Sequence, residues 1–234
     1  MAESLTIPAH CNGPPGSGQG GYTCGLVAAF VDGPAEVTLR SPPPLERALA
    51  VERPGGAVTV RDGETVVAEG RPAGAGELEL PEPVSVEEAR AASEAGYERW
   101  AGSHPFPTCL VCGPERRAPD GLEIFPGAVP GRDMFAAPWT PDASLGDPVA
   151  PEYVWAALDC PTSAPVANFG DGPPVVLGRL AARVLAPVRA GRPHAVISWR
   201  LGVDGRKRTA GAALFTEAGE AVAWSRATWI ELRG

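Results

Sequence analysis

The same order of elements occurs twice along this chain of 234 residues. In each half an apolar segment, residues 22–31 and then residues 151–163, is followed by a run of short β-like segments. The two copies lie about 130 residues apart, a spacing that indicates two copies of one small unit. The repeat therefore predicts an α+β fold in which each unit pairs one helix with antiparallel strands.

Turn residues separate the β-like segments. In the first half the predicted strands are 36–40, 48–53, 57–61 and 65–71. In the second half they are 120–129, 133–139, 175–188, 194–203, 208–216 and 221–232. Asp62-Gly63 and Asp204-Gly205 predict tight hairpin turns, because glycine accepts the positive φ that such turns need. The 29 glycines and 27 prolines fit many short elements and argue against a helical bundle.

A third helix is predicted between the two halves. Ser85 and Glu88 have the spacing of a capping box, and a charged, alanine-rich pattern continues to Trp100. That composition suits a surface connector. We therefore expect a first unit at 1–83, a linking helix at 84–103 and a second unit at 104–234.

Composition excludes several classes of partner. The net charge is -8 and the chain has no long basic cluster, which argues against nucleic acid and anionic membranes. Residues 1–8 lack the basic start and apolar run of a signal peptide, and no apolar stretch is long enough to span a bilayer. Five scattered cysteines fit a reducing cytoplasm better than a disulfide framework.

One acid stands out in the second apolar segment. Asp159 follows helical apolar positions and precedes Pro161, so it is expected in the last helical turn, where the helix dipole disfavours an anion. It is either a hydrogen-bonded structural acid or a catalytic carboxylate. In the first half a glycine-rich loop, residues 12–21, leads into the apolar segment, and it is either a flexible turn or a close approach of backbone N–H groups to a ligand.

The remaining motifs carry less chemistry. Cys109 and Cys112 form a CxxC pair that His104 or Cys160 would complete as a zinc site. A second CxxC or CxxH is missing, so no metal and no other cofactor are expected. Ser-His-Asp catalysis is not expected either, because the chain has no GxSxG elbow.

Three segments resemble the hotdog thioesterases. CLVCGPERRAPDGLEIF, residues 109–125, resembles the CFxCGxxNxxGLxL opening of the phenylacetate-pathway type. VAPEYVWAALDCP, residues 149–161, resembles the HGGxxAxLLDE helix, with Asp159 on the catalytic acid. GQGGYTCGLVAAF, residues 18–30, matches the Gly-Gly entrance of that helix. The two-unit layout is similar to that of acyl-CoA thioesterase II, and the resemblance implies an α+β double hotdog fold.

Comparison of the two helices indicates a divided site. The first half keeps Gly20-Gly21 but has Ala28 where the acid would fall, and the second keeps Asp159 but has Pro151-Glu152 in place of the glycines. In the family the acid and the helix-entrance amide come from different units. The resemblance therefore implies one complete site, in which Asp159 faces Gly20 or Gly21, and an inactive mirror site at Ala28 and Pro151.

The implied activity is hydrolysis of an acyl-CoA or another acyl thioester. Backbone N–H groups of Gly20 and Gly21 would stabilise the oxyanion, and Asp159 would act as general base or as nucleophile. The expected helpers are Ser163, Thr162 and Asn12, and the expected substrate-binding residues are Gln19, Tyr22 and Trp155. The chain departs from acyl-CoA thioesterase II where that family has a Thr and a Gln, since Leu177 or Gly178, and Ala227, stand there.

Two other functions stay open. The first is a non-catalytic acyl-thioester binding protein; the second is an enoyl-thioester hydratase, which would need a histidine that is not near Asp159 in sequence. Coenzyme A phosphates would meet basic residues of the second half: Arg179, Arg183, Arg206, Lys207 and Arg208. Double hotdog units often associate further, so a homo-oligomer is among the expected assemblies.

Overall fold

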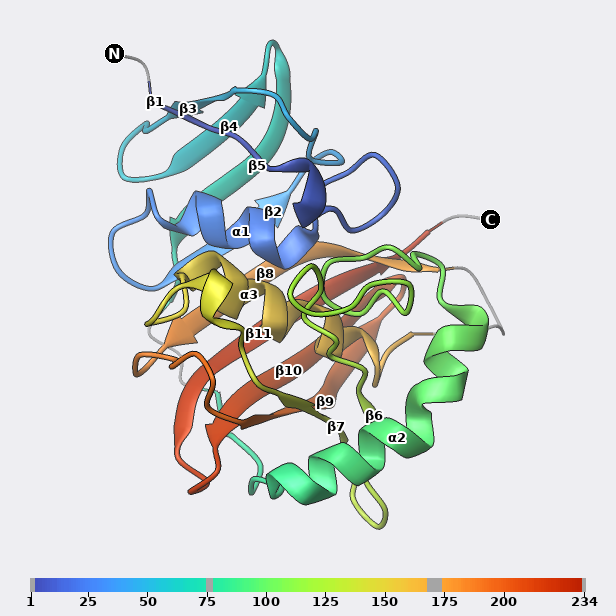
Figure 1. The fold of residues 1–234 in the computed structure, drawn as a ribbon. Coiled ribbons are helices and arrows are strands. Elements are labelled where there is room, and N and C mark those ends of the chain that lie inside the picture. Colours follow the sequence, from blue (N-terminus) through green and yellow to red (C-terminus); the bar gives the residue numbers. More distant parts are fainter. Residues whose placement is uncertain (1–2, 75–77, 168–173, 233–234) are drawn as a thin grey trace.

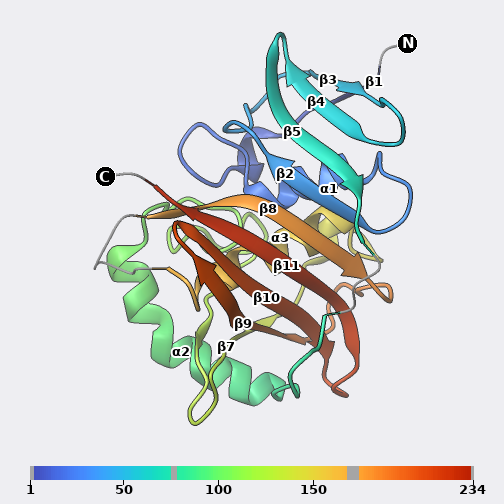
Figure 2. The ribbon, with the colours of Figure 1, turned by 180° about the vertical axis from the view of Figure 1, so that it is seen from behind.

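A single antiparallel sheet forms the body of the protein. The computed structural model describes residues 3–74, 78–167 and 174–232, and among these the sheet has eleven strands. Their order is β1-β3-β4-β5-β2-β8-β11-β10-β9-β7-β6 (Figures 1 and 2). The strands are β1 Glu3–Leu5, β2 Ala35–Leu39, β3 Leu49–Glu52, β4 Val58–Asp62, β5 Thr65–Pro72, β6 Gly127–Ala128, β7 Phe135–Trp139, β8 Val175–Val184, β9 His194–Asp204, β10 Lys207–Thr216 and β11 Ala221–Glu231. The helices are α1 Gly20–Ala28, α2 Val86–Ser103 and α3 Pro151–Asp159.

Most predicted strands are confirmed, but the segment 120–129 is not a strand for most of its length. Only Gly127–Ala128 pairs in the sheet, with β7. The preceding residues bond to a loop instead, since Leu122 N–H donates to Leu110 O and Ile124 N–H to Val111 O, both at 2.9 Å. The backbone groups that a strand would offer to the sheet are thus used elsewhere.

The two halves of the chain occupy contiguous parts of the sheet. Strands β1 to β5 all come from the first 83 residues, and β6 to β11 come from residues after 104. They meet where β2 pairs antiparallel with β8, with Val37 opposite Leu180, and both of these side chains are fully buried. The backbone hydrogen bonds therefore run from one half into the other without a break.

Helices α1 and α3 lie side by side against the same face of the sheet (Figure 1). Helix α1 begins at Gly20, two residues before the first residue of the predicted apolar segment 22–31. It ends at Ala28, three residues before the last residue of that segment. Its start is fixed by Gln19, whose side-chain Oε1 accepts the Tyr22 N–H at 2.6 Å. Helix α3 begins with Pro151, which suits a first helical position because its missing N–H would have no partner there.

Helix α2 has the predicted capping box but is more than a surface connector. Ser85 Oγ accepts the Glu88 N–H, and the Glu88 carboxylate accepts the Ser85 N–H. One side of α2 packs on β6, β7 and β9 and buries Ala89 and Ala92. These alanines form one hydrophobic cluster with Ala195 and Ile197 of β9. Val196, between those two residues, belongs instead to the separate core under α1 and α3. Because side chains alternate along a strand, α2 covers the opposite face of the sheet at this edge.

Among the described residues, no helix combines the length and apolar character needed to cross a membrane.

Candidate active site

Asp159 closes helix α3, as the sequence predicts. A short 3-10 turn, η3 Cys160–Ser163, follows it directly. Thr162 Oγ1 donates to the Asp159 carbonyl at 2.6 Å and accepts the Trp229 Nε1–H at 2.8 Å, which ties this turn to β11. The helix end is therefore held by hydrogen bonds on its backbone side, and the Asp159 carboxylate is left to face α1.

The carboxylate meets the start of helix α1. Asp159 Oδ2 accepts the Gly21 N–H at 2.7 Å and the Gln19 Nε2–H at 2.6 Å. The second oxygen, Oδ1, has no hydrogen-bond partner among the described residues, and the side chain is only 2% exposed. The structure thus brings together Asp159 and Gly21, which are 138 positions apart in sequence, as the divided-site hypothesis requires.

Burial controls the protonation of this acid. Desolvation raises the pKa of Asp159 to about 7, while the hydrogen bonds from Gly21 and Gln19 oppose that rise. The positive end of helix α1 also favours an anion here. A carboxyl group with these neighbours accepts a proton more readily than an ordinary exposed aspartate does.

Gly20 differs from Gly21 in what its amide contacts. Gly21 N–H is occupied by Asp159, whereas no described residue provides an acceptor for Gly20 N–H. Leu177 of β8 packs over this position, and a Cβ added to Gly20 would lie 2.9 Å from Leu177 Cδ2 and 3.3 Å from Asp159 Oδ2. The sequence does not distinguish the two glycines, but the structure does. Gly21 N–H binds the Asp159 carboxylate, and Gly20 N–H is a donor without a described acceptor.

The three predicted helpers make other contacts. Asn12 Nδ2 donates to Thr108 O at 3.1 Å, and its Oδ1 accepts from Arg116. Ser163 Oγ donates to the Cys160 carbonyl at 2.8 Å, and Thr162 binds backbone and Trp229 as described above. These side chains hold loops and the α3 end in place; none is hydrogen-bonded to the Asp159 carboxylate.

The predicted substrate-binding residues separate in space. Gln19 touches the acid itself. Tyr22 is buried, stacks edge-on against Tyr153 at a centroid distance of 5.1 Å and shares the neighbourhood of Cys11 with it. Trp155 lies in the middle of α3, where its side chain packs against Gly25 of α1 and lines a cavity together with Ala28. The sequence predicts that Gln19 contacts the substrate and does not predict its hydrogen bond to Asp159. A sequence signal for that hydrogen bond is the polar side chain at the N-cap of α1.

The mirror position is a cavity of about 500 Å³. Ala28 and Pro151 both line it, as the comparison of the two helices predicts, together with Trp155. It also contains an acid that the comparison did not assign to it, Glu152, in the first turn of α3. Pro151 has no N–H to offer at this helix start, so the amide donor available at Gly20 has no counterpart here.

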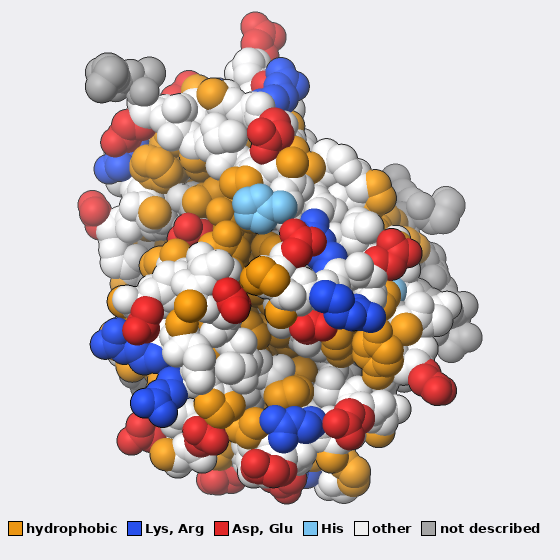
Figure 3. All heavy atoms as spheres, in the orientation of Figure 1, with side chains coloured by type: hydrophobic (Ala, Val, Ile, Leu, Met, Phe, Trp, Pro, Cys, Tyr) orange, Lys and Arg blue, Asp and Glu red, His pale blue; other side chains and the backbone are white. Residues whose placement is uncertain are grey.

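The basic residues proposed for coenzyme A phosphates are largely engaged. Arg179 donates to Thr38 Oγ1 at 3.0 Å, and Arg206 donates to the Glu231 carbonyl at 3.0 Å. Arg208 pairs with Glu231, while Arg183 borders the mirror cavity. Basic and acidic side chains are interspersed over the face that carries α1 and α3 (Figure 3).

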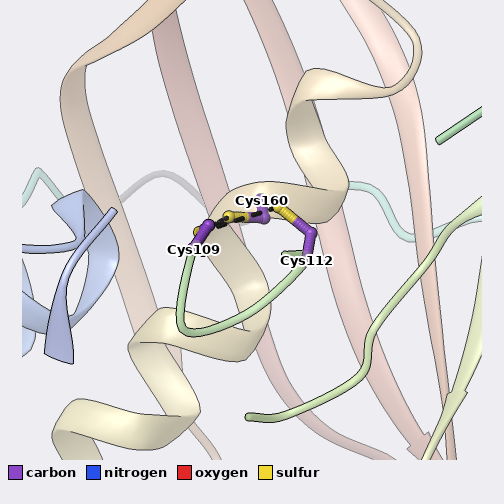
Figure 4. Close-up of side chains that lie close together, drawn as sticks. All are labelled: Cys109, Cys112 and Cys160. Carbon is purple, nitrogen blue, oxygen red and sulfur yellow. Dashed lines mark hydrogen bonds between the residues drawn. The ribbon is translucent and has the colours of Figure 1, made fainter. Parts of the chain in front are cut away.

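Three cysteine side chains form a cluster beside the residue that follows Asp159. Cys109 and Cys112 from one loop and Cys160 from the end of α3 are all buried, with their sulfurs directed toward one another (Figure 4). Cys160 Sγ also lies 3.5 Å from Gln19 Nε2, the atom that binds Asp159. The sequence named Cys160 as one way to complete the CxxC pair, and the fold brings it there.

The fold has clear counterparts among solved structures. A TesB protein of Mycobacterium avium subsp. paratuberculosis superposes with a TM-score of 0.59 at 17% identity, covering 98% of this chain and 91% of that one. An acyl-CoA thioesterase II of Mycobacterium marinum gives a TM-score of 0.56 at 14% identity, covering 93% and 90%. Comparison with protein-family models and with curated proteins gives no match. The chain therefore shares the fold of these two TesB-type proteins, the hotdog fold that the resemblance in its sequence implies.

Proposed function

We propose that this protein is an acyl-thioester hydrolase that acts on acyl-CoA through one site between two hotdog units. The units are residues 1–83 and 104–234, joined by the segment 84–103. The two structural counterparts support a thioester substrate, because one is described as a TesB protein and the other as an acyl-CoA thioesterase II. The five cysteines form no disulfide, which supports a cytoplasmic location.

One observation carries the proposal. The Asp159 carboxylate is fixed at the N-terminus of α1 by Gly21 N–H, directly beside a Gly20 N–H that has no described acceptor. A thioester carbonyl bound to Gly20 N–H would place its carbon next to an acid that is already oriented. A preformed donor of this kind stabilises the developing oxyanion, and loss of one such donor costs about 3 kcal/mol of activation free energy.

The hydrolysis then follows from the two oxygens of Asp159. Oδ2 is held by two donors, so Oδ1 is the oxygen that remains to accept a proton. In the general-base route Oδ1 takes a proton from water, the water oxygen bonds to the carbonyl carbon, and the oxyanion forms at Gly20 N–H. The C–S bond breaks, and the thiolate of coenzyme A leaves and takes up the proton. In the nucleophilic route Oδ1 itself attacks the carbonyl carbon, the C–S bond breaks, and the thiolate of coenzyme A leaves. Water then hydrolyses the mixed anhydride, which restores the Asp159 carboxylate, releases the fatty or aromatic acid and supplies the proton that the thiolate takes up.

The first test replaces the acid by its amide. Asp159→Asn keeps the size of the side chain and an oxygen for the Gly21 N–H, but it cannot take a proton. Turnover of a panel of short, long and aromatic acyl-CoAs, followed by a thiol-reactive dye, should fall about a thousandfold. Binding of the same acyl-CoAs, measured by calorimetry, should change little.

Asp142→Asn is the matched control. Asp142 is exposed and caps the short 3-10 helix η2, Ala143–Leu145, by accepting the Ser144 N–H, a role that asparagine fills equally well. This variant should turn over like the wild type. If Asp159→Asn also retained wild-type turnover, Asp159 would have no part in the mechanism.

A second candidate is an acyl-thioester binding protein without turnover. Leu177 favours it, because an apolar side chain stands against Gly20 where the resemblance implies a hydroxyl or amide partner for the acid. Binding of acyl-CoA without thiol release by the wild type would support this function and contradict hydrolysis. An enoyl-thioester hydratase has less support, since His104 contacts Cys112 and His194 lies beside Trp139, and neither is bonded to Asp159.

A further inference from the structure

The cysteine cluster has the dimensions of a metal site. Cys109 Sγ lies 3.7 Å from Cys160 Sγ and 3.7 Å from Cys112 Sγ, and all three sulfurs lie within 4.8 Å of one another. Zinc bound tetrahedrally by thiolates at about 2.3 Å holds its sulfurs about 3.8 Å apart. A disulfide needs about 2.05 Å between its sulfurs. The observed spacing therefore matches three ligands around one ion.

Each sulfur also has an N–H donor beside it. The backbone N–H groups of Val111 and Cys112 donate to Cys109 Sγ, and Gln19 Nε2 donates to Cys160 Sγ at 3.5 Å. His104 Nε2 lies 3.2 Å from Cys112 Sγ. N–H donors of this kind surround and stabilise thiolates that bind a metal.

The proton on His104 is assigned by its other contact. Nδ1 of this ring accepts the Phe106 N–H at 3.0 Å, so in the neutral ring the proton is on Nε2 and points toward Cys112 Sγ. His104 thus supports a thiolate at Cys112.

The loop around Cys109 is shaped for this arrangement. Gly113 N–H donates to the Cys109 carbonyl at 2.9 Å, which turns the chain back so that Cys109 and Cys112 face the same point. A Cβ at Gly113 would lie 2.5 Å from the backbone of both Cys109 and Pro107, so only glycine fits. Cys160 reaches the same point from the end of α3 (Figure 4).

We infer that Cys109, Cys112 and Cys160 bind one zinc ion through their sulfurs, with His104 and Gln19 as hydrogen-bond donors to the bound thiolates. Binding breaks three S–H bonds, forms three Zn–S bonds and releases the protons to solvent. The sequence expectation of no metal rested on the missing second CxxC or CxxH, and the fold supplies a third thiolate from a segment 48 positions after Cys112. The inference does not depend on thioesterase activity; the ion would tie the 109–112 loop to the residue that follows Asp159.

The test measures metal in the full chain, expressed without a histidine tag and dialysed against a weak chelator. The wild type should retain about one zinc per chain by mass spectrometry of the elements. Cys112→Ser and Cys160→Ser should lose most of it. Cys11→Ser is the matched control, because Cys11 is equally buried but lies beside Tyr22 and Tyr153, outside the cluster, and it should keep the full amount.

Cobalt(II) gives a second readout on the wild type alone, which matters if a serine variant fails to fold. Cobalt bound at this site should show intense thiolate-to-metal charge-transfer bands. A wild-type chain that holds no zinc, takes up cobalt without charge-transfer bands, and shows the same reactive thiols with and without added zinc would overturn the inference. So would full zinc retention by folded Cys112→Ser and Cys160→Ser.

Discussion

Gly21 and Gly25 occupy successive turns of α1 and let the backbone of α3 come close. A Cβ on Gly21 would lie 2.4 Å from Asp159 Cβ and 2.7 Å from the Trp155 carbonyl oxygen. A Cβ on Gly25 would lie 2.5 Å from Glu152 Cα. The short hydrogen bond from Gly21 N–H to Asp159 exists only at this separation, so the glycines serve the site through packing as well as through their amides.

We expect Gly21→Ala to lower the free energy of unfolding by about 1–3 kcal/mol, because the added methyl group meets backbone that cannot move alone. Urea denaturation followed by circular dichroism measures it. Gly102→Ala is the control: Gly102 lies in α2 with open space around its Cβ position, and alanine there should leave stability unchanged or raise it by up to about 1 kcal/mol. Equal midpoints for Gly21→Ala and wild type would contradict the close packing.

At the scale of elements, α2 depends on its capping box. Glu88 accepts the Ser85 N–H at 2.7 Å, which holds the pKa of the Glu88 carboxyl below its usual range. A folded pKa below the unfolded one stabilises the protein above the unfolded pKa, and this contribution is lost as the pH falls through the folded pKa. The start of α2 should therefore loosen in mild acid.

Ser85→Ala should cost about 1 kcal/mol of unfolding free energy at neutral pH, because it removes the acceptor for the Glu88 N–H. Ser85→Asp retains a cap and should cost much less. Denaturation curves across neutral to acid pH check both, and Glu88→Gln should flatten the part of the pH dependence that Glu88 causes. An unchanged stability of Ser85→Ala would show that the packing of α2 on β6 and β7 fixes the helix without its cap.

At the scale of the whole molecule, the pairing of β2 with β8 makes one sheet of the two halves. All six tryptophans lie at residue 100 or later, so their fluorescence reports on the second half and α2. Val37 belongs to the first half, is fully buried and sits opposite Leu180 of the second. A loss of packing at Val37 should therefore change the unfolding transition that is followed by the fluorescence of tryptophans outside the first half.

Val37→Ala should lower the unfolding free energy by about 2 kcal/mol through lost burial and the remaining cavity. The whole tryptophan-monitored transition should shift with it in urea and stay in a single step. Thr59→Ala, a partly exposed position on β4, is the comparison and should shift the transition much less. Two separate transitions, with the tryptophan step unmoved by Val37→Ala, would show that the halves unfold independently.

Local patterns in the sequence were sufficient for most elements. Alternating polarity and Asp-Gly turns located β4, β5, β9 and β10, and the Ser85–Glu88 spacing located the start of α2. The acid at the end of α3 and its partner glycines were also predicted, from the way each helix keeps half of a motif. The segment 120–129 was predicted wrongly, because its apolar residues are buried against a loop and not in a sheet.

The sequence by itself determined most of the strands, the start of α2 and α3, and the expectation that Asp159 faces a partner from the other half. These features depend on side chains a few positions apart, where periodicity and capping act. Only the tertiary structure decided that Gly21 rather than Gly20 holds the acid, that Gln19 binds Asp159, and that Cys160 joins Cys109 and Cys112. The reason is physical: these contacts depend on how closely α1 and α3 pack, which is set by the fit of whole helices against one sheet.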